Sequence, residues 1–157
     1  MTYRSLSLRG EFEAEVLPPL HPYAILCVDD DPAVLAALRR ALRREPYEVL
    51  ATESPRTALE FVEKREISLV ISDHRMPQMS GIEMLQAIHE RSPGTTGMIL
   101  TGYPESLSLD GRFGSVVRRV LLKPWNDRVL VGMVRHLLRE KEQGRGPGKE
   151  NDLGGSG

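Results

Sequence analysis

The sequence predicts an α/β fold, a (βα)5 arrangement in which a doubly wound parallel sheet of five strands carries helices on both faces. The first supporting observation is that short apolar runs alternate with segments whose apolar residues recur at helical spacing. The second is that parallel strands need crossover connections, which the intervening helical segments supply. The chain has 157 residues, 40% of them hydrophobic and 27% charged, so it can bury the core of one such domain.

The first two strand–helix units are marked by capping residues. Residues 23–28 form a continuous apolar run, typical of a strand that is buried on both faces. Asp31 and Pro32 then provide a helix cap and a first helical residue, and apolar residues follow at helical spacing. A weaker strand is expected at residues 47–51, and Ser54 is expected to cap the second helix.

Three further strands are expected at residues 67–72, 96–100 and 116–122. An amphipathic helix follows the strand expected at residues 67–72. The stretch 104–114, which follows the strand expected at residues 96–100, carries two glycines and few apolar residues and is therefore a weak helix former. An amphipathic helix closes the domain, and its apolar stripe comprises Val129, Leu130, Met133, Val134, Leu137 and Leu138.

Composition sets the limits of the folded unit, which we expect at residues 23–142. Residues 1–22 mix charges with prolines and show no sustained period, so an irregular N-terminal extension is expected there. Residues 143–157 are rich in glycine, serine and charge and cannot bury enough apolar surface to order themselves. They are expected to form a disordered tail.

Several functional classes are disfavoured by composition. The single cysteine, Cys27, lies in an apolar run and indicates a reducing compartment with no intramolecular disulfide. No apolar run is long enough to span a bilayer, and the N-terminus lacks the apolar core of a secretory signal. A formal net charge of −1 argues against direct nucleic-acid binding. The expected location is cytoplasmic, without contact to membrane or nucleic acid.

Polar residues follow four of the five strands, at the edge where open α/β sheets bind ligands. Three of them are aspartates, and close carboxylates repel one another unless a hard cation such as Mg²⁺ neutralises them. A carboxylate nucleophile, a metal ion, an ammonium group and a hydroxyl are together the parts needed to form an aspartyl phosphate. The residues at this edge are Asp29 and Asp30 after the first strand, Asp73 after the third, Thr101 after the fourth and Lys123 after the fifth.

Four segments in this order, VDDDP, SDHRMPQMSGIEML, LTGY and LLKPW, resemble the receiver domains of two-component response regulators. The resemblance covers about residues 23–140 and implies the flavodoxin-like strand order 2-1-3-4-5. It also implies a cis peptide bond before Pro124. The implied site consists of Asp73 as phosphoacceptor, Asp30, Asp29, Asp73 and the backbone carbonyl of Arg75 around Mg²⁺, Thr101 as the switch hydroxyl and Lys123 as the phosphate-binding lysine.

The resemblance implies a signalling module rather than an enzyme. Its implied partners are a sensor histidine kinase or phosphotransfer protein and a downstream output domain or protein. A homodimer is a further expectation, through the face formed by the stretch 104–114, the strand expected at residues 116–122 and the closing amphipathic helix. The stretch from Ser106 to Gly114 is expected to be the mobile element of that face. One residue departs from the family pattern, because Val120 stands where receivers usually carry an aromatic residue.

Two alternatives remain open at this point. The chain is alternatively a receiver-like interaction module that signals without phosphorylation, which Val120 favours. A Mg²⁺-dependent phosphotransferase or phosphatase acting on a free substrate is disfavoured, since there is no glycine-rich phosphate loop.

Two residues next to the predicted site, His74 and Tyr103, have less certain roles. Strand alternation directs His74 away from Asp73, and Tyr103 is a candidate gate as the nearest aromatic residue.

Overall fold

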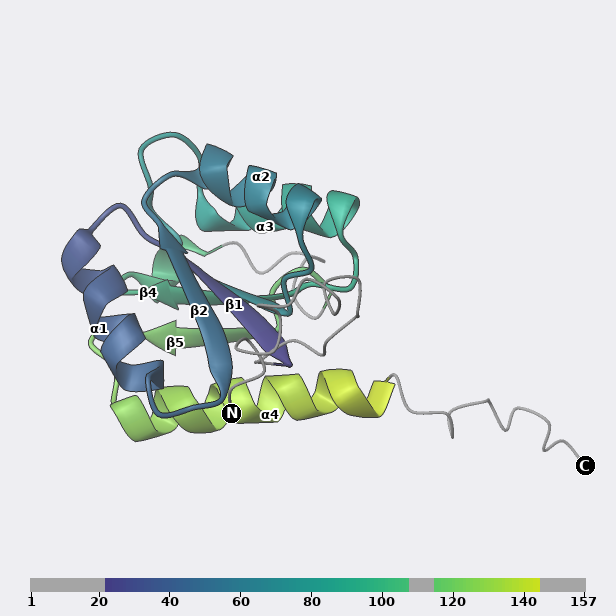
Figure 1. Ribbon diagram of the computed structural model, residues 1–157. Coiled ribbons are helices and arrows are strands. Elements are labelled where there is room, and N and C mark those ends of the chain that lie inside the picture. The colour runs from purple at the N-terminus through teal and green to yellow at the C-terminus, as the bar shows by residue number, and fades with distance from the viewer. Residues whose placement is uncertain (1–21, 108–114, 145–157) are drawn as a thin grey trace, which may run out of the picture.

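The structure is a computed structural model that describes residues 22–107 and 115–144. It has three layers, with a parallel five-stranded sheet between two pairs of helices (Figure 1). In chain order the elements are β1 (Tyr23–Val28), α1 (Pro32–Leu42), β2 (Tyr47–Thr52), α2 (Pro55–Lys64), β3 (Leu69–Asp73), α3 (Gly81–Arg91), β4 (Thr96–Thr101), a short 3-10 helix (Pro104–Ser106), β5 (Arg119–Leu122) and α4 (Asp127–Gly144).

The strands lie in the order β2-β1-β3-β4-β5, which confirms the predicted fold class and topology. Apolar residues of α1 and α4 pack on one face of the sheet, and those of α2 and α3 pack on the other. β1 lies in the middle of this arrangement, with Ile25, Leu26, Cys27 and Val28 fully buried. This two-sided burial explains why β1 is a continuous apolar run rather than an alternating one.

The helices begin where their capping residues predict. The Asp31 side chain accepts a hydrogen bond from the backbone N–H of Ala33, and Ser54 does the same for Thr57. At α3 a capping box joins Ser80 and Glu83, each side chain accepting from the backbone N–H of the other.

Two predicted strand boundaries are wrong because apolar runs report burial rather than strand pairing, and the predicted start of one helix's apolar stripe is wrong because its first residue is exposed. The third strand begins at Leu69, although Ile67 is buried. The fifth strand begins at Arg119, although Val116 and Val117 are buried. In α4, Val129 is 50% exposed, so the predicted apolar stripe begins one residue later, at Leu130. A side chain can fill the core from a connecting segment as well as from a strand.

The predicted N-terminal extension and C-terminal tail lie outside the described residues, apart from Pro22, Gln143 and Gly144, and both stay predictions. Most of the stretch from Ser106 to Gly114, expected to be mobile, also lies outside them; the described Pro104–Ser106 form the 3-10 helix. Within residues 22–107 and 115–144, no helix is long and apolar enough to cross a bilayer.

Candidate functional site

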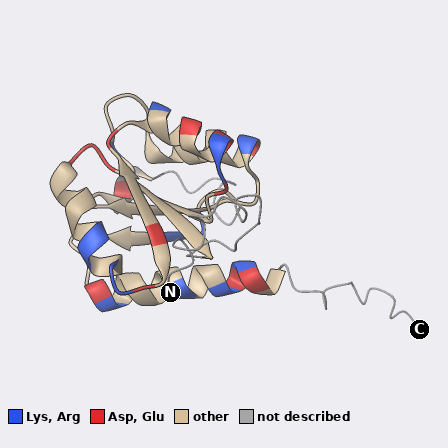
Figure 2. Cartoon of the chain, viewed as in Figure 1, with Lys and Arg blue, Asp and Glu red and all other residues tan. Residues whose placement is uncertain are grey.

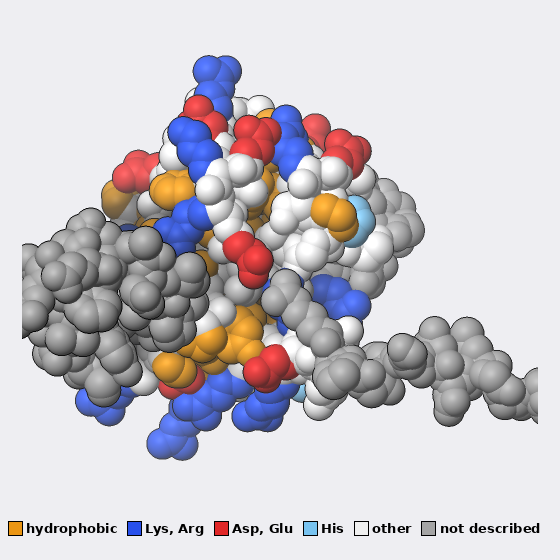
Figure 3. Space-filling view, turned by 45° about the vertical axis from the view of Figure 1, so that its right-hand side comes forward, with side chains coloured by type: hydrophobic (Ala, Val, Ile, Leu, Met, Phe, Trp, Pro, Cys, Tyr) orange, Lys and Arg blue, Asp and Glu red, His pale blue; other side chains and the backbone are white. Residues whose placement is uncertain are grey.

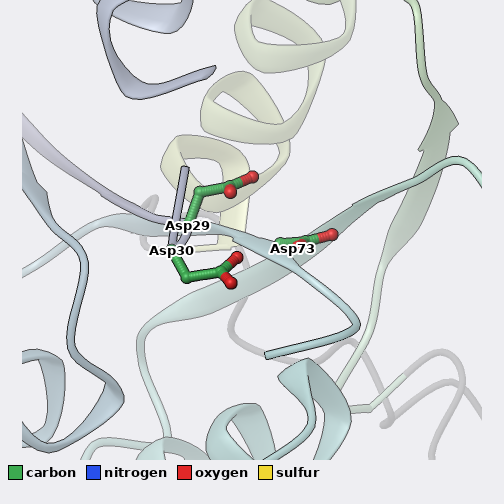
Figure 4. A group of neighbouring side chains, drawn as sticks. All are labelled: Asp29, Asp30 and Asp73. Atoms are coloured by element: carbon green, nitrogen blue, oxygen red, sulfur yellow. The ribbon is translucent and has the colours of Figure 1, made fainter. Parts of the chain in front are cut away.

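Three aspartates meet at the carboxyl edge of the sheet. Asp29 and Asp30 follow β1, and Asp73 ends the neighbouring strand β3. Their side chains lie around one space (Figure 4), with one oxygen of each within 4.8 Å of the others. The parallel pairing of β1 with β3 brings these positions together although more than forty residues separate them.

Lys123 supplies the positive charge of the site. Its Nζ donates to Asp29 Oδ2 at 2.9 Å and lies 3.2 Å from Asp73 Oδ1. The Lys123 backbone N–H donates to the carbonyl of Thr101 at 2.8 Å, so the lysine is anchored to the end of β4. The Lys123–Pro124 peptide bond is cis, as the family resemblance implied.

Burial and charge shift the pKa values of two groups in the site. Burial raises the pKa of Asp29, although the Asp31 backbone N–H and the Lys123 ammonium favour its ionised form and partly offset the effect. Burial alone would lower the pKa of Lys123, but its hydrogen bond to Asp29 and the charges of Asp29 and Asp73 outweigh this and raise it. The contacts with Asp29 and Asp73 therefore favour the charged form of the lysine.

Neighbouring residues hold both the backbone carbonyl and the side-chain carboxylate of Asp73. The Ser72 hydroxyl donates to the Asp73 carbonyl at 2.7 Å, and the His74 backbone N–H donates to Asp73 Oδ1 at 2.9 Å. At Gly81, a Cβ atom would lie only 2.2 Å from the Asp73 carbonyl oxygen. The sequence analysis missed the roles of Ser72 and Gly81. The glycine at the first position of a helix was the available signal, since most other residues favour that position more.

His74 is buried, with 8% of its surface exposed, and its Nδ1 atom has no hydrogen-bond partner among the described residues. The potential metal-binding group found in the described part of the chain contains the three aspartates and not this imidazole. The structure therefore gives His74 no direct place in the carboxylate cluster.

Thr101 and Tyr103 lie on the loop that follows β4. The Thr101 side chain is buried, and its Oγ1 accepts a hydrogen bond from the Tyr103 backbone N–H at 2.9 Å. The Tyr103 ring is 55% exposed and contacts the guanidinium group of Arg75, whose Cζ lies 4.7 Å from the ring centroid. Arg75 comes two residues after Asp73, and the role of its carbonyl as a metal ligand stays a prediction.

The donor set suits Mg²⁺. All of the ligands that the cluster offers are carboxylate oxygens, and Asp29 is buried, Asp73 half-buried and Asp30 exposed. The site is therefore closed on one side and open on the other, where an open cavity of about 550 Å³ adjoins Asp30 and the loop after β3. Mg²⁺ prefers such sites because it retains several water ligands alongside one or two carboxylates.

Residues 25–135 match the family described as the response regulator receiver domain. The chain belongs to the response regulator receiver family. It is therefore a receiver domain of two-component signalling, as the four sequence motifs implied, and such domains act generally as signalling modules rather than enzymes. Val120, which departs from the family pattern, lies in β5 and packs against the core on the α2–α3 side.

Two full-length relatives are similar to this receiver domain. It is 34% identical over 139 residues to the response regulator protein FleR of Pseudomonas aeruginosa, covering 82% of this chain and 26% of FleR. It is 31% identical over 115 residues to the hydrogenase transcriptional regulatory protein HoxA of Cupriavidus necator, covering 73% of this chain and 24% of HoxA. The chain thus spans about a quarter of the length of these relatives.

Two solved receiver structures are similar as well. The signal receiver domain of an HD domain-containing protein from Pseudomonas fluorescens Pf-5 has a TM-score of 0.74 and 32% identity, covering 83% of this chain and 97% of that one. The response regulator TrrA from Thermotoga maritima, in complex with Mg²⁺ and BeF, has a TM-score of 0.67 and 29% identity, covering 73% and 98%. The similarity extends over nearly the whole of both structures.

Proposed function

We propose that this receiver domain accepts a phosphoryl group on Asp73, in a Mg²⁺-dependent reaction, from a sensor histidine kinase or a phosphotransfer protein. The observation that carries the proposal is the grouping of three carboxylates within 4.8 Å, with the Lys123 ammonium in contact with two of them. Holding three like charges together in a partly buried site costs free energy, so the cluster favours a functional role over a structural one.

In the proposed reaction a carboxylate oxygen of Asp73 attacks phosphorus, and the bond from phosphorus to the donor breaks with its electrons leaving on the donor. Asp29, Asp30, Asp73 and the Arg75 carbonyl would hold Mg²⁺, which when bound neutralises charge on the carboxylates and on a phosphoryl oxygen. Lys123 would turn its ammonium group from the carboxylates to a second phosphoryl oxygen. The Thr101 hydroxyl would donate a hydrogen bond to the third phosphoryl oxygen. The chain contributes positioning and charge rather than covalent chemistry of its own.

The product would act as a switch. A phosphoryl group adds up to two negative charges, which bias the conformation of the surrounding surface. The partner-binding or homodimer face would include β5, whose Leu122 precedes Lys123 and is 52% exposed, and α4, whose Val129 is 50% exposed. A downstream output domain or protein would read this face. We further infer that the reaction takes place in the cytoplasm, where a phosphodonor kinase would present its phosphohistidine.

The direct test is phosphorylation by acetyl phosphate with Mg²⁺, followed by intact-mass spectrometry. The wild-type chain should gain the mass of one phosphoryl group, and Asp73→Asn should gain none. Asp31→Asn is the matched control, because it removes a neighbouring exposed carboxylate while asparagine still caps α1. Its mass gain should equal that of the wild type.

Tryptophan fluorescence provides a second readout. Trp125 is the only tryptophan, lies two residues after Lys123 and donates its indole N–H to Asp127 at 3.0 Å. Its emission should change with Mg²⁺ and again with beryllofluoride, and the second response should vanish in Asp73→Asn. Saturable Mg²⁺ binding without any mass gain would favour a receiver-like interaction module that signals without phosphorylation. Repeated turnover of a free phosphate ester would instead indicate a phosphatase.

A further inference from the structure

A contact between Arg75 and Tyr103 joins the two loops that border the site. Arg75 lies two residues after Asp73, and Tyr103 lies two residues after Thr101. The guanidinium carbon is 4.7 Å from the ring centroid, within the range of a cation–π interaction. Since β3 and β4 are neighbouring strands, this contact crosses the gap between the ends of both.

The backbone of Tyr103 is coupled to the hydroxyl group that would bind phosphate. Its N–H donates to Thr101 Oγ1 at 2.9 Å. If Thr101 turns its hydroxyl toward a phosphoryl group on Asp73, the oxygen that now accepts from Tyr103 must move as well. The Thr101 side chain is only 1% exposed, so this movement is transmitted to bonded neighbours rather than absorbed by solvent.

Arg75 would gain a better partner at the same moment. An exposed cation–π contact is weak, whereas a guanidinium group binds a phosphoryl group through strong charge-assisted hydrogen bonds. A phosphoryl group on Asp73 would therefore draw Arg75 away from the ring. The changes at Thr101 and at Arg75 would each disturb a contact that Tyr103 makes in this structure.

We propose that the Arg75–Tyr103 stack is a clasp that is closed in the unphosphorylated receiver domain and opens when Asp73 is phosphorylated. The Tyr103 ring, which is already 55% exposed, then takes another position on the surface that a partner would contact. Tyr103 would thereby relay phosphorylation without an aromatic residue at the position of Val120, which is a β-branched aliphatic side chain packed against the core. This inference rests on the proposed phosphorylation of Asp73.

Tyrosine NMR tests the clasp. The chain has four tyrosines, so a sample with ¹³C-labelled tyrosine rings gives few resonances, and Tyr103→Phe identifies the one that belongs to Tyr103. With Mg²⁺ and beryllofluoride this resonance should shift clearly in the wild type. Tyr23 and Tyr47 form an edge-to-face pair at the starts of β1 and β2, at the other edge of the sheet, and their resonances should stay unchanged.

The Arg75→Gln variant tests whether the Arg75–Tyr103 stack, rather than another change near the site, determines the position of the Tyr103 resonance. Without beryllofluoride its Tyr103 resonance should already be displaced toward the wild-type activated position, and beryllofluoride should then shift it by less than half the wild-type amount. Arg75→Lys, which keeps the cation, should restore part of the resting position. Arg56→Gln, on the exposed side of α2, is the matched control and should behave as the wild type.

Two results would overturn the clasp while leaving the proposed function intact. The first is a phosphoryl mass gain on Asp73 with an unmoved Tyr103 resonance. The second is a resting resonance that Arg75→Gln does not displace. By contrast, if the chain gains no phosphoryl mass and neither Trp125 nor Tyr103 responds to beryllofluoride, the proposed function itself fails, and the clasp fails with it.

Discussion

The substitution Gly81→Ala should destabilise the domain and weaken its Mg²⁺ site together. A Cβ atom at this position would lie 2.2 Å from the Asp73 carbonyl oxygen and 2.9 Å from Ile99 Cδ1, whereas Cβ contacts under 3.0 Å essentially never occur. The nearest obstacle is backbone, which cannot rotate away. Overpacking of this kind costs about 1–3 kcal/mol, and the better helix propensity of alanine returns only about 0.5–1 kcal/mol.

Because the clashing atom is backbone, the upper end of the overpacking range applies, and we expect a net loss of about 2 kcal/mol in the free energy of unfolding, or roughly 8 °C in Tm for a domain of this size. Mg²⁺ affinity should fall as well, because the displaced carbonyl belongs to the residue that carries the central carboxylate. Urea denaturation and a Mg²⁺ titration of Trp125 fluorescence measure the two effects. Gly132→Ala is the control: no atom lies within 4 Å of its added Cβ, so stability should rise slightly. Wild-type stability and Mg²⁺ affinity in Gly81→Ala would show that the structure tolerates a Cβ atom at this position.

Three further changes act on charges. In Lys123→Met, Mg²⁺ should raise Tm more than in the wild type, because no cation then offsets Asp29 and Asp73; an unchanged thermal shift would contradict this. Burial raises the pKa of Asp29, so the stability that it contributes at low pH is lost as the pH rises through its folded-state pKa. In EDTA, Asp29→Asn should therefore become increasingly more stable than the wild type as the pH rises above about 4, the ordinary pKa of an aspartate, as urea midpoints would reveal. The hydrogen bond from Arg135 lowers the pKa of Glu45, so their ion pair stabilises the fold above the unfolded pKa and is lost on acidification. Glu45→Gln should flatten the fall of the urea midpoint below about pH 5, and a curve parallel to the wild type would argue against the pair.

The parts of the fold that could be predicted from the sequence are those fixed by local chemistry. β1 and the start of α1 were predicted correctly, because a two-sided apolar run and an Asp31-Pro32 cap both act within a few residues. The starts of β3 and β5 could not be found in this way. Ile67 and Val117 are as buried as strand residues, and only pairing with a neighbouring strand distinguishes the two cases.

In the candidate site, too, some features could be predicted from the sequence and others could not. That Asp29, Asp73 and Lys123 would share one edge followed from parallel topology, because each comes at the end of a strand. The details required three-dimensional packing. Nothing in the sequence indicated that the lysine would donate to Asp29, or that the chains after β3 and β4 would be joined by Arg75 and Tyr103.

The unequal exposure of the three aspartates suggests how the proposed switch begins. Asp29 is 2% exposed at its side chain and is held by the Asp31 N–H and by Lys123, so its carboxylate keeps one orientation. Asp30 is exposed and leaves room for water in the shell of an ion. The same ammonium group contacts Asp29 and Asp73, so a phosphoryl group arriving on Asp73 would compete with Asp29 for it. On this reasoning the first event after phosphorylation is a redistribution of hydrogen bonds around Lys123. Movements of the surrounding loops then follow from that local exchange.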